Sequence, residues 1–137
     1  MADTIHLEIV TPERLLLKAD VESVQIPGLD GELGILPGHS PLISELKPAG
    51  LLSYVEGGKT SQVVIGDGFV EVMPEIVQVL ADTAERPNEI DVERAILLKE
   101  RAEKLLAQAT GDPTIDAAAA NSQLALANTR LQVAGKK

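Results

Sequence analysis

The 137-residue sequence changes its hydrophobic period near residue 87, and this change limits the folds that it can adopt. Before that point, apolar and polar residues alternate in short runs, as in residues 5–9, where His6 and Glu8 separate three aliphatic side chains. Alternation at every second residue is typical of a strand with one buried face. Beyond it, apolar residues recur at helical spacing. The sequence therefore predicts two structural parts, residues 1–86 and residues 87–137.

The first part consists of short apolar runs separated by turn-forming residues. The runs are residues 5–9, 15–17, 21–26, 33–36, 51–55, 63–65, 69–73 and 76–80. Pairs such as Asp30-Gly31, Pro37-Gly38 and Asp67-Gly68 lie between them. Many short strands with closely spaced turns predict an antiparallel sandwich or barrel. The Gly57-Gly58 pair predicts a tight hairpin, because a primed turn needs positive φ at both central residues.

The second part predicts two helices joined by a turn. One apolar face of the first helix is formed by residues spaced at i, i+4, i+7 and i+11, namely Leu98, Ala102, Leu105 and Ala109. Asn88 or Asp91 is a candidate N-cap for this helix, and Asp116 is one for the second. The Gly111-Asp112-Pro113 turn between them predicts an antiparallel helical hairpin.

Alanine in this hairpin favours helix formation but weakens helix docking. Residues 117–120 are four consecutive alanines, and Ala has the highest intrinsic helix propensity. Each buried alanine nevertheless removes little apolar area from water, and burial stabilises by roughly 25 cal/mol per Å². The pattern therefore permits a C-terminal element that forms readily and docks weakly.

Composition and charge exclude several classes of function. The net charge is −9, and it lies entirely in residues 1–86, which hold 14 acidic and 5 basic residues against 7 of each in residues 87–137. An acidic chain is unsuited to nucleic acid or an anionic membrane surface, since both attract basic faces. The chain has no cysteine, which excludes disulfides and thiolate metal sites. Neither a signal peptide nor an apolar run of about 20 residues is present, so we expect a soluble cytosolic chain.

The stretch GELGILPGHSPLI at residues 31–43 invites a catalytic or phosphate-binding interpretation. His39 and Ser40 are adjacent, and neighbours on a strand point to opposite faces, whereas a Ser-His-Asp triad needs convergence. The stretch also lacks the Lys-Ser/Thr end of a phosphate-binding loop. Turn formation is therefore favoured over catalysis. The two histidines show no spacing typical of a metal site, so we expect no catalytic residue and no metal.

Asp91, Arg94 and Arg101 share one helix face, because they are separated by three and seven residues. Two guanidinium groups on one stripe suit a polyphosphate. A solvated helix face with an Asp–Arg pair explains the same spacing, and spacing alone favours this second interpretation.

Four motifs taken together resemble one family, the ε subunits of bacterial F-type ATP synthases. They are GELGILPGHSPL at residues 31–42, GFVEV at 68–72, VLADTAER at 79–86 and IDVERA at 90–95. The resemblance implies an antiparallel β-sandwich of about ten strands in residues 1–86, which binds the rotor. It implies a regulatory α-helical antiparallel hairpin in residues 87–137.

The function that the resemblance implies is that of a non-catalytic rotor subunit in the central stalk. Such a subunit couples the catalytic head to the c ring, and its mobile hairpin inhibits ATP hydrolysis. The implied partners are the γ subunit, the c ring and, transiently, the α and β subunits, without nucleic acid or membrane insertion. The implied location is the cytoplasmic face of the bacterial plasma membrane, as part of the complex.

The resemblance also implies two sets of residues. The residues implied to contact the c ring are Gly31, Glu32, Leu33, Gly34, His39 and Leu42. No cofactor is required, but ATP is an implied regulatory ligand of Glu85, Ile90, Asp91, Arg94, Ala95, Arg101 and Arg130. A second arginine of the second helix is replaced here by Leu126, and losing one charged hydrogen bond weakens such a site by about 1.5–3 kcal/mol.

Two other functions stay open at the level of the sequence. The first is a free-standing binding module whose sandwich holds a protein partner and whose hairpin mediates oligomerisation. The second, much less favoured, is an enzyme that uses His39. Binding to γ and the c ring would distinguish the rotor subunit from the module, and loss of hydrolysis in His39→Ala would support the enzyme.

Overall fold

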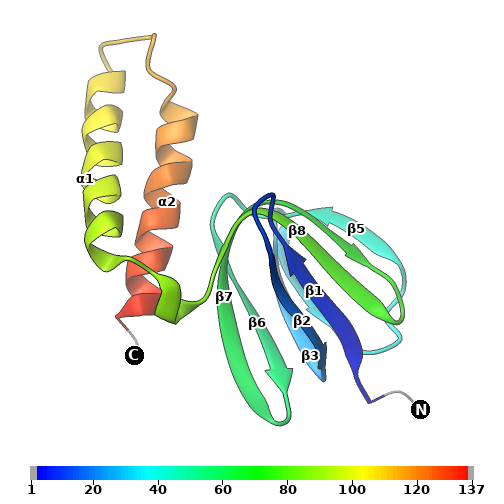
Figure 1. Ribbon diagram of the computed structural model, residues 1–137. Coiled ribbons are helices and arrows are strands. Elements are labelled where there is room, and N and C mark those ends of the chain that lie inside the picture. The colour runs from blue at the N-terminus through cyan, green and yellow to red at the C-terminus, as the bar shows by residue number, and fades with distance from the viewer. Residues whose placement is uncertain (1–2, 136–137) are drawn as a thin grey trace. The chain divides into compact units, whose positions relative to one another are not determined.

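The computed structural model describes residues 3–135 and divides into two compact units, Met1–Arg86 and Pro87–Lys137 (Figure 1). The first unit holds eight strands, β1 (Ile5–Val10), β2 (Leu15–Val21), β3 (Ser23–Gly28), β4 (Gly31–Ile35), β5 (Leu42–Glu45), β6 (Gly50–Glu56), β7 (Lys59–Val72) and β8 (Ile76–Glu85). The second holds a short 3-10 helix, η1 (Pro87–Glu89), and two α-helices, α1 (Val92–Ala109) and α2 (Ala117–Ala134).

Strand β7 joins the two layers of the sandwich. The strands follow the order β2-β1-β8-β7-β6-β3-β4, and β5 also pairs with β7. The first half of β7 pairs with β6, from Glu56↔Lys59 to Gly50↔Ile65. Its second half pairs with β5, from Glu45↔Phe69 to Leu42↔Val72. Between the halves, Asp67 and Gly68 have φ values of 52° and 124°, which interrupt the extended backbone. One strand can therefore contribute to both layers.

The core between the layers consists almost entirely of aliphatic side chains. Alternate residues of β1 are buried, so that Ile5, Leu7 and Ile9 point inward. They pack in one cluster with buried residues from the other strands, including Val24 and Leu52. Tyr54 is buried as well, whereas Phe69 is half exposed. The alternation in the sequence therefore reflects strands with one face in the core and the other face toward solvent.

The fold class expected from the sequence is confirmed as a β-sandwich followed by a helical hairpin, but three details differ from the expectation. The unit has eight strands where the resemblance implied about ten. Residues 63–65 and 69–73, expected as two strands on either side of a turn, belong to one long strand, β7. The sheet is mixed, since β1 runs parallel to β8 (His6↔Ile76 to Val10↔Leu80). In addition, β5 was missed as a strand, because its four residues are too short to show a period.

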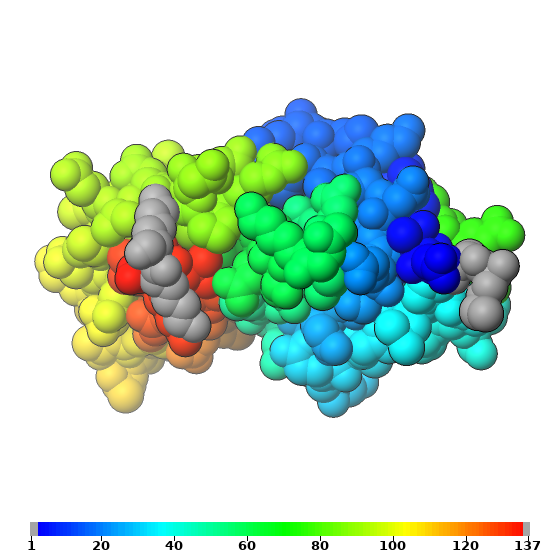
Figure 2. Space-filling view, turned by 90° about the horizontal axis from the view of Figure 1, so that it is seen from below, coloured from blue at the N-terminus to red at the C-terminus, as the bar shows by residue number. Residues whose placement is uncertain are grey.

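The turn between β6 and β7 has the predicted primed geometry. Gly57 and Gly58 have φ values of 57° and 76°, and this confirms the hairpin. The Gly58 N–H donates to the Glu22 carboxylate over 2.7 Å, which ties the turn to the β2–β3 junction. Figure 2 shows this turn, in green, at the surface of the unit beside the blue β2–β3 segment.

Histidine 6 bridges two carboxylates on the outer face of the sheet. Its Nδ1 lies 3.0 Å from Asp20 Oδ1 on β2, and its Nε2 lies 3.0 Å from Glu8 Oε2 on β1. The bond to Asp20, assisted by the one to Glu8 and opposed by partial burial, raises the pKa of His6. Bonds from Gln78 and His6, with Lys18 nearby, lower the pKa of Glu8. This cluster stabilises the pairing of β1 with its neighbours.

The hairpin packs along alanines spaced seven residues apart. Ala95 and Ala102 of α1 are buried, as are Ala120, Ala127 and Ala134 of α2. Of the face predicted for α1, only Ala102 is fully buried, and Leu98, Leu105 and Ala109 are partly exposed. The contact is therefore poorer in leucine than the sequence suggested. No helix within residues 3–135 has the length and apolarity required to cross a bilayer.

Both predicted caps close their helices. The Asp91 carboxylate accepts from the Arg94 N–H over 3.1 Å, and the Asp116 carboxylate accepts from the Ala119 N–H over 3.0 Å. Asp91 rather than Asn88 is therefore the N-cap of α1. In the connecting loop, bonds from the hydroxyl and the backbone N–H of Thr114 lower the pKa of Asp112.

Replacing Gly68 with alanine should disrupt the junction in β7. A Cβ at this position would lie 2.0 Å from the Leu80 carbonyl oxygen of β8, and the φ of 124° is unfavourable for any other residue. We expect Gly68→Ala to lower the free energy of unfolding by at least about 2 kcal/mol in urea denaturation. Gly111→Ala is the matched control, because a Cβ there meets nothing within 4 Å. Equal stability of the two variants would contradict the prediction.

The His6 cluster should make stability depend on pH. The raised pKa of His6 means that its protonated form stabilises the fold below its ordinary value of 6.5, and this contribution is lost as pH rises through the raised value. The lowered pKa of Glu8 gives a contribution that is present above 4.5 and lost on acidification. We therefore expect His6→Gln to cost more stability at pH 5.5 than at pH 8.5, measured by urea unfolding.

His39→Gln provides the control for this experiment. His39 contacts a backbone carbonyl, that of Ser40 at 2.7 Å, and within residues 3–135 it forms no ion pair with a carboxylate. Its replacement should therefore change stability by similar amounts at both pH values. The same loss at pH 5.5 and pH 8.5 for His6→Gln would show that the cluster does not stabilise the fold through its charge.

Candidate functional site

Four apolar side chains lie in register across the outer face of one layer of the sandwich. Phe69 of β7 pairs with Leu80 of β8, Leu80 with Val10 of β1, and Val10 with Leu15 of β2. Phe69 and Leu80 are each 52% exposed and Leu15 is 55% exposed. We call these four residues the apolar row. Exposed apolar residues that are contiguous, not scattered, are typical of a protein docking surface.

A polar row runs beside the apolar row on the same face. It pairs Glu71 with Gln78, Gln78 with Glu8, and Glu8 with Lys18, and at its β5 end Glu71 pairs with an exposed apolar residue, Ile43. An apolar strip bordered by charged side chains is the usual composition of a protein–protein interface. The alternation in residues 69–73 and 76–80 indicates which side chains share the outer face of each strand. It does not indicate which residues of neighbouring strands lie side by side, so the two rows could not be predicted from the sequence.

The six residues implied to contact the c ring lie in two segments that are not paired with each other. Gly31, Glu32, Leu33 and Gly34 are on β4, which pairs with β3. His39 lies in the following turn, where the Gly38 N–H donates to the Pro74 carbonyl over 2.9 Å, and Leu42 begins β5.

These six residues also differ in what their side chains contact. Leu33 and Leu42 pack against the core. Gly31, Glu32 and Gly34 are exposed, and His39 is partly exposed. Glu32 additionally lines a shallow groove of about 290 Å³ with Gln25, Ser53 and Gln62. The surface that a partner could reach is therefore the β4 strand with its glutamate, and the contact with a c ring stays a prediction.

The residues implied to bind ATP are divided between the two units. Glu85 is the last residue of β8, whereas the other six belong to the second unit. Arg94 and Arg101 are exposed on α1, seven residues apart. Ile90 and Ala95 are buried, and Asp91 caps α1. The arginines are thus accessible to an anion, while Asp91, Ile90 and Ala95 already have structural roles.

On α2, Arg130 is partly exposed and already interacts with another residue, and Leu126 is partly exposed. The second helix therefore offers one guanidinium to a ligand at these positions. Whether ATP binds stays a prediction.

The structure does not support a catalytic role for His39 and Ser40. The bond from His39 goes to the carbonyl oxygen of Ser40 and not to its hydroxyl. Among residues 3–135 no group of three His, Asp or Glu side chains is arranged to hold a metal ion.

Comparison with known proteins gives a consistent match along the chain. The family model described as ATP synthase, Delta/Epsilon chain, beta-sandwich domain matches residues 4–87. The one described as ATP synthase, Delta/Epsilon chain, long alpha-helix domain matches residues 88–135.

Individual relatives agree with the family models. The chain is 44% identical over 135 residues to the ATP synthase epsilon chain of Nitratidesulfovibrio vulgaris (strain DP4), with 98% of each chain covered. It is 54% identical over 106 residues to that of Koribacter versatilis (strain Ellin345), covering 77% of this chain and 74% of the relative.

A solved structure supports the same assignment. A chain in the cryo-EM structure of the Euglena gracilis mitochondrial ATP synthase, OSCP/F1/c-ring in rotational state 1, has a TM-score of 0.79 and 26% identity, covering 94% of this chain and 80% of that one. The chain therefore belongs to the delta/epsilon chain family of ATP synthase, alongside the bacterial epsilon chains, and is a non-catalytic subunit of that complex.

Proposed function

We propose that this chain is the rotor subunit that connects the catalytic head of a bacterial F-type ATP synthase to its c ring. The observation that carries the proposal is the apolar row, because a half-exposed row of this kind on a folded unit needs a protein partner to cover it. Family membership supplies the class of partner, and the row supplies a surface for it. The chain would then work at the cytoplasmic face of the plasma membrane, as part of the complex.

The γ subunit is the partner that we assign to the apolar row. The row crosses β7, β8, β1 and β2, so its position is fixed by backbone pairing and does not depend on loops. A rigid surface suits a subunit that transmits torque, since rotation must not be absorbed by local bending. The c ring is assigned to β4, where Glu32 is exposed beside two glycines, Gly31 and Gly34.

The hairpin is assigned a regulatory role. The fully buried side chains of its two helices are alanines apart from Val133, so separating the helices exposes less apolar surface than a leucine contact would. We infer that it can leave its folded form and reach the α and β subunits, inhibiting ATP hydrolysis. ATP held by Arg94, Arg101 and Arg130 would stabilise the folded form and oppose inhibition, more weakly than in members with a second arginine in place of Leu126.

Binding of γ should depend on the apolar row. We expect Leu80→Ser and Leu15→Ser each to weaken the binding of purified γ by about tenfold or more, because each removes a half-exposed apolar side chain from the interface. Leu36→Ser is the matched control, since Leu36 is 64% exposed but lies outside the row. Calorimetric titration gives the three dissociation constants. Similar values for all three variants would exclude the row as the γ surface.

Inhibition should depend on the hairpin and on ATP. We expect a complex whose chain ends at residue 87 to hydrolyse ATP faster than the full complex at low ATP concentration. The difference should shrink at millimolar ATP if ATP stabilises the folded hairpin. In the Arg94→Gln/Arg101→Gln variant the inhibition should persist at high ATP, because the exposed guanidinium groups are missing.

The two parts of this prediction can fail separately. Equal rates with and without residues 88–137 at every ATP concentration would refute an inhibitory hairpin. Inhibition that is indifferent to ATP in the unmodified chain would refute the ATP site alone.

A further inference from the structure

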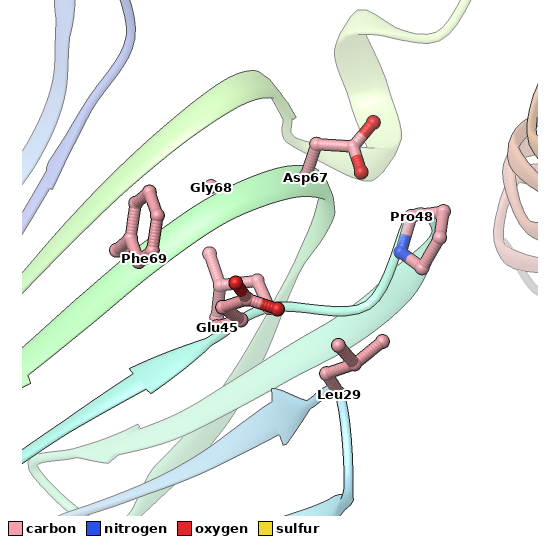
Figure 3. A pocket seen from close by; sticks show the side chains of 7 residues that line it. Leu29, Glu45, Pro48, Asp67, Gly68 and Phe69 are labelled. Atoms are coloured by element: carbon pink, nitrogen blue, oxygen red, sulfur yellow. The ribbon is translucent and has the colours of Figure 1, made fainter.

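An open groove lies where the apolar row meets the kink of β7. It measures about 340 Å³ and is lined by Leu29, Glu45, Pro48, Asp67 and Phe69, among others. Figure 3 shows the Glu45 side chain between Phe69 on one side and Pro48 on the other, with Leu29 nearby and Asp67 at the rim. The groove can therefore offer a ligand both apolar packing and a charged hydrogen bond.

The backbone fixes the shape of this groove. The Asp67 N–H donates to the Lys47 carbonyl over 3.0 Å, and the Leu46 N–H donates to the Gly68 carbonyl over 2.9 Å. The Leu29 N–H donates to the Glu45 carbonyl over 2.9 Å. Three segments distant in sequence are thereby joined by hydrogen bonds, so the groove exists before any partner arrives.

The two carboxylates of the groove have no cationic partner. Within residues 3–135, neither Glu45 nor Asp67 forms an ion pair with a lysine, arginine or histidine. The unit that contains them has 14 acidic and 5 basic residues. No third His, Asp or Glu among the described residues joins them in a group arranged to hold a metal ion. The charge is therefore complementary to an organic cation.

The groove is continuous with the apolar row. Phe69 belongs to both, and it pairs in register with Glu45 on β5, at the point where the row ends. A segment lying along Leu80 and Phe69 would therefore reach Glu45 next. The aliphatic stem of a long basic side chain can pack on Leu29, Pro48 and Phe69 while its charged end meets the carboxylate.

We propose that this groove binds a lysine or arginine side chain of the γ subunit. The inference rests on the proposed function, because the apolar row is what directs γ to this end of the sheet. Glu45 forms the charged hydrogen bond, and Asp67 at the rim adds attraction through space. Apolar contacts along the row are non-directional and would allow γ to slide. The charged hydrogen bond in the groove fixes the position of γ along the row.

The test measures binding of purified γ to the full chain in low salt and in 0.5 M salt. We expect Glu45→Gln to weaken binding about tenfold in low salt, by removing the charge from one hydrogen bond, and Asp67→Asn to weaken it less. Asparagine tolerates the left-handed backbone conformation at position 67, so the second variant changes the charge and leaves the kink intact. High salt should bring wild type and variants closer together.

Glu56→Gln is the matched control, because Glu56 is an exposed glutamate at the end of β6, outside the groove and the row. It should bind γ as the wild type does. Unchanged melting temperatures of all three variants would exclude misfolding as the cause of any difference.

The outcomes separate this proposal from the proposed function. If Glu45→Gln binds γ as tightly as wild type while Leu80→Ser binds weakly, the groove proposal is wrong and the γ surface stands. If wild type itself does not bind γ, the proposed function fails and the assignment of the groove fails with it. Self-association of the chain that disappears in Glu45→Gln would assign the groove to a second copy and overturn the proposal.

Discussion

The kink in β7 at Asp67 and Gly68 is the constraint on which the rest of the first unit depends. It allows one strand to pair with β6 in one layer and with β5 in the other while β8 stays in constant register beside it. The contact between Gly68 and β8 leaves no space for a Cβ, so glycine is required there on steric grounds. The apolar row and the groove both begin at this kink, because Phe69 follows it directly.

The two units are stabilised by different kinds of contact. The sandwich buries large aliphatic side chains such as Leu7, Ile26 and Leu52 almost completely. The hairpin buries mostly alanines, which permit close packing but contribute less apolar area per residue. Its helices are closed instead by local caps at Asp91 and Asp116, which need no tertiary partner. A helix stabilised locally can change its tertiary contacts without unfolding, as the regulatory role that we propose for the hairpin requires.

Local chemistry made much of this structure predictable from the sequence. The Gly57-Gly58 turn, the helix cap at Asp116 and the alternation of β1 each depend on residues adjacent in the chain. Pairing between distant segments was not predictable, because nothing near Ile5 indicates that β1 lies parallel to β8. The same limit applies to the candidate sites. Arg94 and Arg101 were found from spacing within one helix, but the apolar row and the groove depend on the alignment of several strands.

The uneven charge of the chain has a simple interpretation in these terms. The sandwich carries the whole net charge, whereas the hairpin sequence is neutral overall. A charged surface attracts a partner of opposite sign over about 8–10 Å at physiological ionic strength, which orients it before contact. Such steering suits the γ-binding surface that we propose, because that surface has to dock in one orientation and then stay in place. The hairpin sequence is neutral overall, so in the regulatory role that we propose its release would depend mainly on the alanine contact and on what binds its exposed arginines.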